Sequence, residues 1–230
     1  MTKPHVLMLT PYLPYPPVSG GRMRTYNLVK NLSEDYAITL VSFGRPEERA
    51  LDYSPMAAFC EDFIVIDRES SPGTLKAALM SLTSPRAITL RLYRTQAMVD
   101  TLTRIIAEHK PDVIHLESFY MMQNLPENHG IPVLLSEPAI EYLAWARHAK
   151  VAQPVYTRPG IALEALKMRF SEPKAWESAD MVGAMSEIDA QIIRKAAPKA
   201  VPTLTPNGVD VQFFNKNVAI DRDSVTAVYM

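Results

Sequence analysis

Four acidic or hydroxyl side chains stand directly after two short apolar segments, where they could contact a ligand. The segments are Val113–Leu116 and Val133–Leu135, and the side chains that follow them are Glu117, Ser118, Ser136 and Glu137. Residues just past the carboxyl ends of parallel strands line the ligand crevice of an open sheet. Carboxylates and hydroxyls there would suit a hydroxyl-rich acceptor. The two serines could equally cap the helices that follow, and both interpretations stay open at this point.

Glu137 and Glu141 are the residues that we consider for catalysis. They are four positions apart, so a helix would place them on one face. Two ionised carboxylates on one face repel each other, which raises the pKa of one of them and suits a general base. The sequence offers no further assignment of catalytic residues.

A glycine pair, Gly20–Gly21, precedes a predicted helix that has Arg24 in its first turn. Glycine lets the backbone approach a ligand closely, and a helix N-terminus offers unpaired N–H groups to a phosphate. The Arg24 guanidinium could add a forked pair of donors. The pattern therefore predicts a phosphate contact, with an ordinary turn and a solvated arginine as the alternative. The fingerprints of dinucleotide sites and of P-loops are absent.

The elements that must position these side chains alternate along the chain. Short apolar runs predict strands at 6–9, 37–43, 63–66, 113–116, 131–135, 181–184 and 201–204. Helical spacing predicts helices at 22–32, 75–82, 96–109, 162–177 and 190–197, and a partly helical segment at 46–59. Such alternation indicates an α/β fold with a doubly wound parallel sheet, which has helices on both faces.

The composition excludes several classes of protein. Of the 230 residues, 47% are hydrophobic and 21% are charged, which excludes a disordered chain or a fibre. The net charge of −1 argues against a nucleic-acid partner. The single Cys60 cannot form an internal disulfide, and no histidine stands at metal-ligand spacing, so we expect no metal. No secretory signal or run of about 18 apolar residues occurs, and we expect a cytoplasmic protein.

The C-terminal part breaks the alternation. We expect one α/β domain over residues 1–214, a polar linker over 215–223, and at 224–230 the first strand of a further domain. A lone strand has nothing in this chain with which to build a second sheet. Alternatively, the exposed strand 225–230 could pair two copies of the chain into a homodimer.

A basic, apolar segment lies between residues 70 and 99, where the sequence contains no aspartate or glutamate. Its cations are Lys76, Arg86, Arg91 and Arg94, and they are interleaved with leucines and with Met80, Ile88 and Tyr93. Cations that flank an apolar face suit an anionic lipid surface, which predicts peripheral contact with the inner face of a membrane. The alternative is an amphipathic helix pair that packs on the sheet with a solvated basic edge.

Several motifs, in their order and spacing, resemble the N-terminal half of family 4 glycosyltransferases, which are retaining enzymes of GT-B fold. The motifs are Ser19–Gly21 with Arg24, Lys110–His115, Glu172–Trp176, Met185–Glu187, and Pro206–Asp210 with Phe213. The resemblance covers essentially the whole chain and implies a Rossmann-like, acceptor-side domain. It also implies that Gly20, Gly21, Arg24, Asn207 and Gly208 face the donor phosphate across the interdomain cleft, whereas spacing alone would allow a hairpin at Asn207–Gly208.

The family resemblance implies an activity as well. Family members transfer a sugar from a nucleotide-sugar co-substrate to a glycan or lipid-linked acceptor, without a further cofactor, in pathways such as polysaccharide biosynthesis. Their donor is gripped by a second domain, so we expect this chain to be inactive alone. The sequence departs from the family after Val133–Leu135: Glu137, Pro138 and Ala139 stand where many members have His-Asp or His-Asn, while Glu141 matches the family's glutamate.

Two other functions remain open. A nucleotide-sugar epimerase of the same two-domain architecture would also hold its nucleotide largely in a second half. A non-catalytic interaction module would explain the altered segment Ser136–Ala139.

Overall fold

The computed structural model describes residues 2–48, 50–68, 74–211 and 215, with the backbone only for 74–78. The linker predicted beyond residue 215, the strand predicted at 224–230 and the side chain of Lys76 lie outside the described residues.

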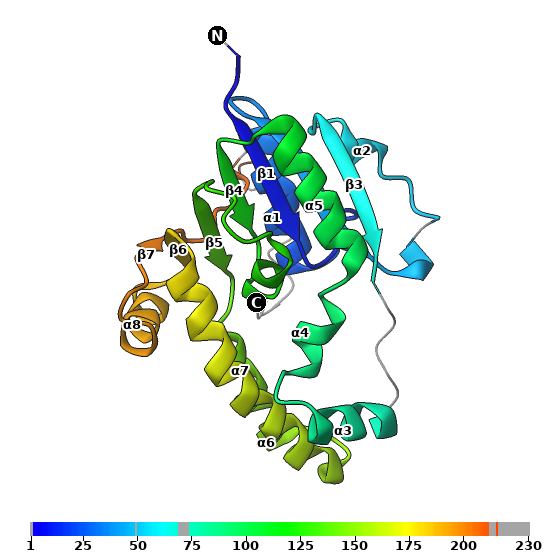
Figure 1. Ribbon diagram of the computed structural model, residues 1–230, viewed down its shortest axis with the longest axis vertical. Helices are drawn as coiled ribbons and strands as arrows, with labels where there is room; N and C mark the ends of the chain where they lie inside the picture. Colours follow the sequence, from blue (N-terminus) through cyan, green and yellow to red (C-terminus); the bar gives the residue numbers. More distant parts are fainter. Residues whose placement is uncertain (1, 49, 69–73, 212–214, 216–230) are drawn as a thin grey trace, which may run out of the picture.

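The seven strands predicted before residue 205 are confirmed, and they form one sheet of parallel strands in the order β3-β2-β1-β4-β5-β6-β7 (Figure 1). Their bounds are β1 His5–Thr10, β2 Ala37–Gly44, β3 Asp62–Asp67, β4 Val113–Leu116, β5 Val133–Glu137, β6 Met181–Ala184 and β7 Pro202–Leu204. Val6 of β1 pairs with Ile38 on one side and with Val113 on the other, so β1 lies inside the sheet.

The two faces of the sheet bury alternate residues of each strand. Leu7 and Leu9 belong to a large apolar cluster on one face, which includes helix α5 (Gln96–His109). Val6 and Met8 belong to a second cluster, against α1 (Gly20–Leu32) and α2 (Ser54–Ala57). Because both faces are covered, the strands read as continuous apolar runs, and the doubly wound α/β fold is confirmed.

Three of the predicted helices become α1, α5 and α8 (Glu187–Ala196), and two more become α3 (Thr74–Thr83) and α7 (Arg158–Ser178). Two helices were not predicted: α4 (Ile88–Leu92) and α6 (Glu141–Val151). Short 3-10 turns occur at Pro46–Glu48, Phe119–Asn124 and Val155–Thr157. No strand forms at residues 205–210, so the hairpin alternative at Asn207–Gly208 is wrong.

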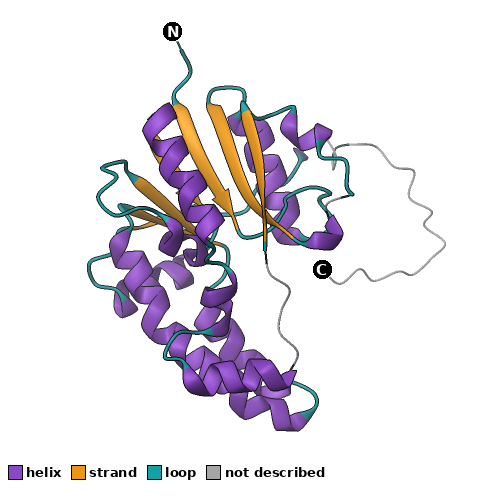
Figure 2. Cartoon of the chain, turned by 45° about the vertical axis from the view of Figure 1, so that its right-hand side comes forward, coloured by secondary structure: helices purple, strands orange, loops and turns teal. Residues whose placement is uncertain are grey.

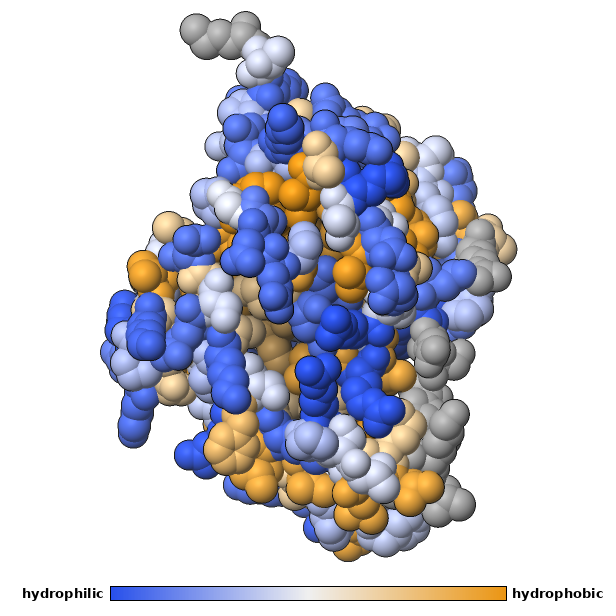
Figure 3. Space-filling view, in the orientation of Figure 1, coloured by the Kyte–Doolittle hydropathy of each residue, from blue (hydrophilic) through white to orange (hydrophobic). Residues whose placement is uncertain are grey.

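Helices α3, α4, α6 and α7 form a group that we call the helical lobe. The arrowheads of the strands point toward it, so it lies beyond the carboxyl edge of the sheet (Figure 2). Helix α7 packs along α6 and contacts α3. The alternative that the basic segment would pack on the sheet is wrong for α3, which packs against α4 and α7 and leaves Leu79 and Leu82 exposed. Apolar side chains gather at this end of the molecule (Figure 3).

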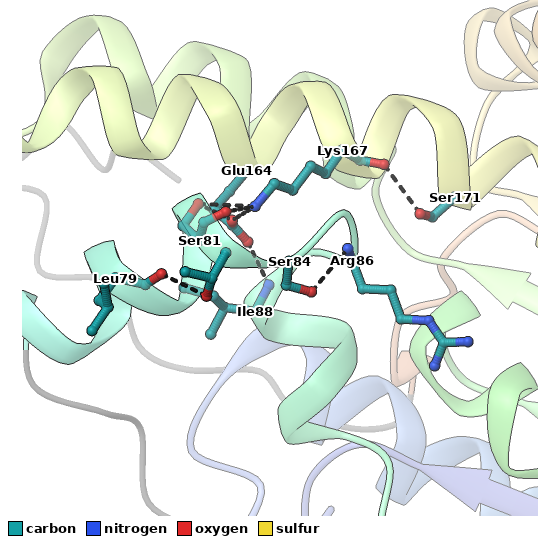
Figure 4. A network of polar contacts seen from close by, with 9 residues as sticks. Leu79, Ser81, Ser84, Arg86, Ile88, Glu164, Lys167 and Ser171 are labelled. Carbon is teal, nitrogen blue, oxygen red and sulfur yellow. Dashed lines mark hydrogen bonds and ion pairs between the residues drawn. The ribbon is translucent and has the colours of Figure 1, made fainter.

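A polar network joins α3 and α4 to α7 (Figure 4). The buried carboxylate of Glu164 accepts hydrogen bonds from the Ser81 hydroxyl at 2.5 Å and from the Ile88 backbone N–H at 2.5 Å. Lys167 lies one turn along α7, and its Nζ is 2.9 Å from Glu164 Oε1 and donates to the Ser81 carbonyl at 2.5 Å. Buried polar groups must be satisfied, so this network fixes how the lobe is assembled.

We expect Glu164→Gln to lower the free energy of unfolding by about 1–2 kcal/mol, because the amide keeps one acceptor but loses the ion pair with Lys167. Urea denaturation measures the change. Glu187→Gln is the matched control, since it breaks a pair with Arg194 whose side chains are about half exposed; such a pair contributes less than about 1 kcal/mol. Equal effects of the two substitutions would contradict the role given to Glu164.

Candidate functional site

The structure brings together two residues that the sequence placed in different sites. Glu117 follows β4 and Arg24 lies on α1, and Nη1 of Arg24 is 2.7 Å from both carboxylate oxygens of Glu117. Glu117 is fully buried. The Nε2 atom of His115 lies 3.0 Å from Glu117 Oε1, within ion-pair distance although not at hydrogen-bond geometry. The guanidinium that we expected to face a phosphate is therefore neutralised by a carboxylate of the same chain.

The ionised form of Glu117 is the favoured one. Burial alone would raise the pKa of this carboxyl, but His115 and Arg24 together outweigh burial and hold the pKa below its usual value. The charge of Glu117 is thus compensated within the fold.

The glycine pair was predicted to precede a helix, and in the structure it forms the first two residues of α1. The space beside Gly21 is taken. A Cβ atom on Gly21 would lie 2.8 Å from the hydroxyl oxygen of Tyr12, so a larger residue here would have to displace the end of that side chain. Gly20 is exposed and has open space around its Cα. The predicted phosphate contact therefore stays a prediction, and Gly20 is the half of the pair that a ligand could approach.

A second carboxylate, Glu137, is the last residue of β5 and is almost fully buried. Its Oε1 accepts the backbone N–H of Phe119 at 2.9 Å. Among the described residues, neither the Oε2 of Glu137 nor the indole N–H of Trp176 has a hydrogen-bond partner. Trp176 nevertheless acts to lower the pKa of Glu137. Burial, followed by the charges of Glu172 and Glu141, raises the pKa of Glu137 well above its usual value. The neutral acid is the favoured form of Glu137.

Glu172, which sequence reasoning used only for the family resemblance, proves to be part of this site. It lies on α7, and its two oxygens accept the backbone N–H groups of Glu141 and Tyr142 at 2.8 Å each. These groups open α6, where the residue at the N-cap, Ile140, has no side-chain acceptor. Glu172 therefore caps α6 from another helix. Burial raises its pKa, against the lowering effect of the two hydrogen bonds.

Glu141 is the accessible member of the three carboxylates. It is half-buried at the start of α6, whereas Glu137 and Glu172 are buried. Burial raises the pKa of Glu141, while the Tyr120 and Trp145 side chains lower it. The helix face that we expected Glu137 and Glu141 to share does not exist, because Glu137 ends a strand. The charge of Glu141 nevertheless contributes, after burial and Glu172, to the raised pKa of Glu137.

The two serines and the Asn207–Gly208 segment lie in different surroundings. Ser118 accepts the Tyr120 N–H at 3.4 Å and so caps the 3-10 turn, as the alternative interpretation held. Ser136 caps nothing, and its buried hydroxyl has no partner among the described residues. Asn207 and Gly208 are exposed in the segment after β7. Strands β4, β5 and β6 separate β7 from β1, so this segment follows the edge of the sheet rather than its centre.

In the part of the chain that the structure describes, no three histidine, cysteine or acidic side chains come together as metal ligands do. The same residues include no helix that is both long and apolar enough to cross a bilayer.

No family model matches the sequence, and no curated protein matches it. Solved structures do match the fold. Sucrose-phosphate synthase from Thermosynechococcus elongatus has a TM-score of 0.56 at 14% identity, over 91% of this chain and 49% of that protein. The glycosyltransferase UGT71G1 from Medicago truncatula, solved with UDP-glucose, has a TM-score of 0.54 at 13% identity, over 90% and 51%. A putative UDP-N-acetylglucosamine 2-epimerase from Listeria monocytogenes has a TM-score of 0.50 at 13% identity, over 90% and 46%.

The chain has the Rossmann-like fold of GT-B proteins. It spans about half the length of the solved structures that it matches. At these identities the likeness concerns the fold alone.

Proposed function

We propose that this chain is the acceptor-side half of a retaining GT-B glycosyltransferase, which moves a sugar from a nucleotide-sugar to a hydroxyl of a glycan or lipid-linked acceptor. The observation that carries the proposal is the carboxyl edge of the sheet, where β4 and β5 lead directly into the carboxylates Glu117 and Glu137. Ligands of open parallel sheets bind at this edge. The similarity in fold to about half of each matched nucleotide-sugar enzyme supports it.

The pairing of Arg24 with Glu117 supports the acceptor-side role. A donor diphosphate needs cations or free N–H groups, and the charge of Arg24 is already compensated. On this proposal a second domain grips the donor, and this chain orients the acceptor. Catalysis would then depend on positioning the two substrates and on stabilising the departing diphosphate.

Transfer assays on two lengths of the protein test the proposal. We expect a longer version that includes a donor-binding domain to transfer sugar from one of a panel of nucleotide-sugars, detected by mass spectrometry of the acceptor. The 230-residue chain should show no turnover. Transfer by the 230-residue chain alone would contradict the acceptor-side assignment. Conversion of the nucleotide-sugar without any acceptor would instead identify an epimerase, and the absence of nucleotide-sugar affinity in calorimetry would identify a non-catalytic module.

Glu141 is the residue that we propose to contact the acceptor, since it is less buried than Glu137 and Glu172. In the active, longer protein, Glu141→Gln should lower kcat/KM for the acceptor about tenfold, as expected for the loss of one hydrogen bond to a charged group. The KM for the donor should not change. Glu177→Gln, at an exposed position in the last turn of α7, is the matched control. A change in donor KM alone would contradict this role.

A further inference from the structure

The helical lobe carries an excess of positive charge. Residues 74–92 and 141–178 contain nine lysines and arginines and four glutamates, a net charge of +5 in a chain whose total is −1. Glu164 and Glu172 are buried and Glu141 is half-buried, while Glu177 lies at the end of α7 that leads to β6. The exposed cations of the lobe are Arg86, Arg91, Arg147, Lys150, Arg169 and Lys174. Among the described side chains, the exposed charges of the lobe are therefore almost all positive.

Large apolar side chains stand among these cations. Leu82 on α3 is 76% exposed, and Phe170 on α7 is 65% exposed. The others on the lobe are Leu79, Val151, Val155, Tyr156 and Leu166. They lie on α3, on α7 and at the turn between α6 and α7, and the space-filling view shows apolar side chains gathered at this end of the molecule (Figure 3). Apolar groups gathered in this way mark an interaction surface.

Two grooves flank α7, and Leu166 lines both of them. One, of about 540 Å³, runs between α6 and α7 and is lined by alanines and by Lys150, Arg158 and Arg169. The other, of about 590 Å³, lies between α7, α4 and the 3-10 turn after β4, and is lined by Phe119, Met122, Arg86, Arg94 and Lys174 among others. Neither groove has an acidic side chain among its described lining residues.

We propose that the helical lobe docks on an anionic lipid bilayer. In this arrangement the headgroup region receives the exposed leucines of α3 together with Leu166 and Phe170 of α7. The surrounding cations contact lipid phosphates. A second copy of the chain fits this surface poorly, because a twofold contact through the lobe would place cations against cations. The inference concerns the lobe alone and does not depend on the proposed function.

Vesicle sedimentation with the 230-residue chain tests the proposal. We expect binding to phosphatidylcholine vesicles in which about a third of the lipid is phosphatidylglycerol, and at least tenfold weaker binding to phosphatidylcholine alone. Binding should weaken as salt is raised, because exposed charges are screened. The absence of binding to the anionic vesicles, or equal binding to both kinds, would overturn the proposal.

A pair of charge-reversal variants tests the location of the contact. Arg169→Glu with Lys174→Glu reverses one cation in each groove and should reduce anionic-vesicle binding about tenfold or more. Lys195→Glu with Lys199→Glu changes the net charge by the same amount at exposed positions on or just after α8, and should leave binding nearly unchanged. Equal losses in the two variants would show only a general charge effect and would overturn the assignment to the lobe.

A fluorescent substitution keeps the test independent of charge. In Phe170→Trp the new indole replaces an exposed side chain, so the fold should be retained, and its emission should shift to the blue when anionic vesicles are added. Ile188→Trp, at a 71% exposed position on α8, should show no shift. A shift at position 188 without one at 170 would overturn the proposed orientation. An acidic protein partner would be indicated if neither vesicle bound and such a protein caused the shift at 170.

Discussion

Replacing Glu117 by alanine should lower the free energy of unfolding by about 3–5 kcal/mol at neutral pH. The carboxylate is fully buried, and its removal leaves the Arg24 guanidinium without a counter-charge in a site where only 17% of the arginine side chain is exposed. Desolvating an unpaired cation accounts for most of the loss. Urea denaturation at pH 7 measures it.

The control for this prediction is Glu108→Ala, which breaks a pair with Arg104 in which both side chains are 54% exposed. That change should cost less than about 1 kcal/mol. The loss in Glu117→Ala should also depend on pH. The pKa of Glu117 is lower in the folded protein than in the unfolded chain, where it is about 4.3. The stabilisation by Glu117 is therefore present above the unfolded pKa and disappears as pH falls through the folded pKa. A loss that stayed constant down to the most acidic pH at which the protein folds would contradict the ion pair.

Glu137→Gln should have the opposite sign and stabilise the protein increasingly as pH rises above the unfolded pKa of this carboxyl. The buried acid has a raised pKa, so the folded protein holds a proton that the unfolded chain releases. Between the unfolded pKa and the folded pKa, the free energy of unfolding therefore falls as pH rises, by up to about 1.4 kcal/mol per pH unit. The glutamine is neutral at every pH and can still accept the Phe119 N–H, so it removes this slope.

The measurement is the difference in unfolding free energy between wild type and Glu137→Gln, from urea titrations at several values between about pH 5 and 8. The difference, rather than either slope alone, isolates Glu137, because burial raises the pKa values of Glu141 and Glu172 as well. We expect the free energy of unfolding of Glu137→Gln to increase relative to that of wild type as pH rises. A difference that does not change with pH would mean that Glu137 is ionised in the folded protein.

The strands were predictable because β-α-β sheets bury both faces. A strand such as β1 then reads as an unbroken apolar run, which no amphipathic helix resembles. The helices α5 and α8 carry local signals as well: Thr95 and Ser186 cap them with side-chain acceptors. Their types and approximate bounds follow from residues near in sequence.

Helix α6 escaped prediction because its cap comes from far along the chain. No side chain next to Ile140 accepts the first N–H groups, and Glu172 does so from about 30 positions away. Helix α4 has only five residues and no side-chain cap at Ala87. In neither case does a residue near in sequence make the stabilising contact. Helix propensity and the spacing of apolar residues therefore could not reveal these two helices.

The candidate site was predictable as a place but not as a set of contacts. Because Glu117 and Glu137 stand at the ends of predicted strands in the sequence, their place at the carboxyl edge of the sheet was predicted correctly. Their partners depend on tertiary structure: Arg24 is 93 residues from Glu117 in sequence, and Phe119 is 18 residues from Glu137. The same limit applies to Ser136, for which helix capping and ligand contact both stayed open: its hydroxyl caps nothing and is buried without a partner among the described residues.

Ionic strength should separate the two surfaces of this protein. At the carboxyl edge, Arg24 offsets the charge of Glu117, and the raised pKa of Glu137 favours its neutral form, so an uncharged hydroxyl group can approach with little electrostatic cost. Affinity there should change little between dilute and concentrated buffer. At the lobe, an uncompensated set of cations makes any contact sensitive to added electrolyte. A single salt titration could thus distinguish ligands that reach the edge from those that reach the lobe.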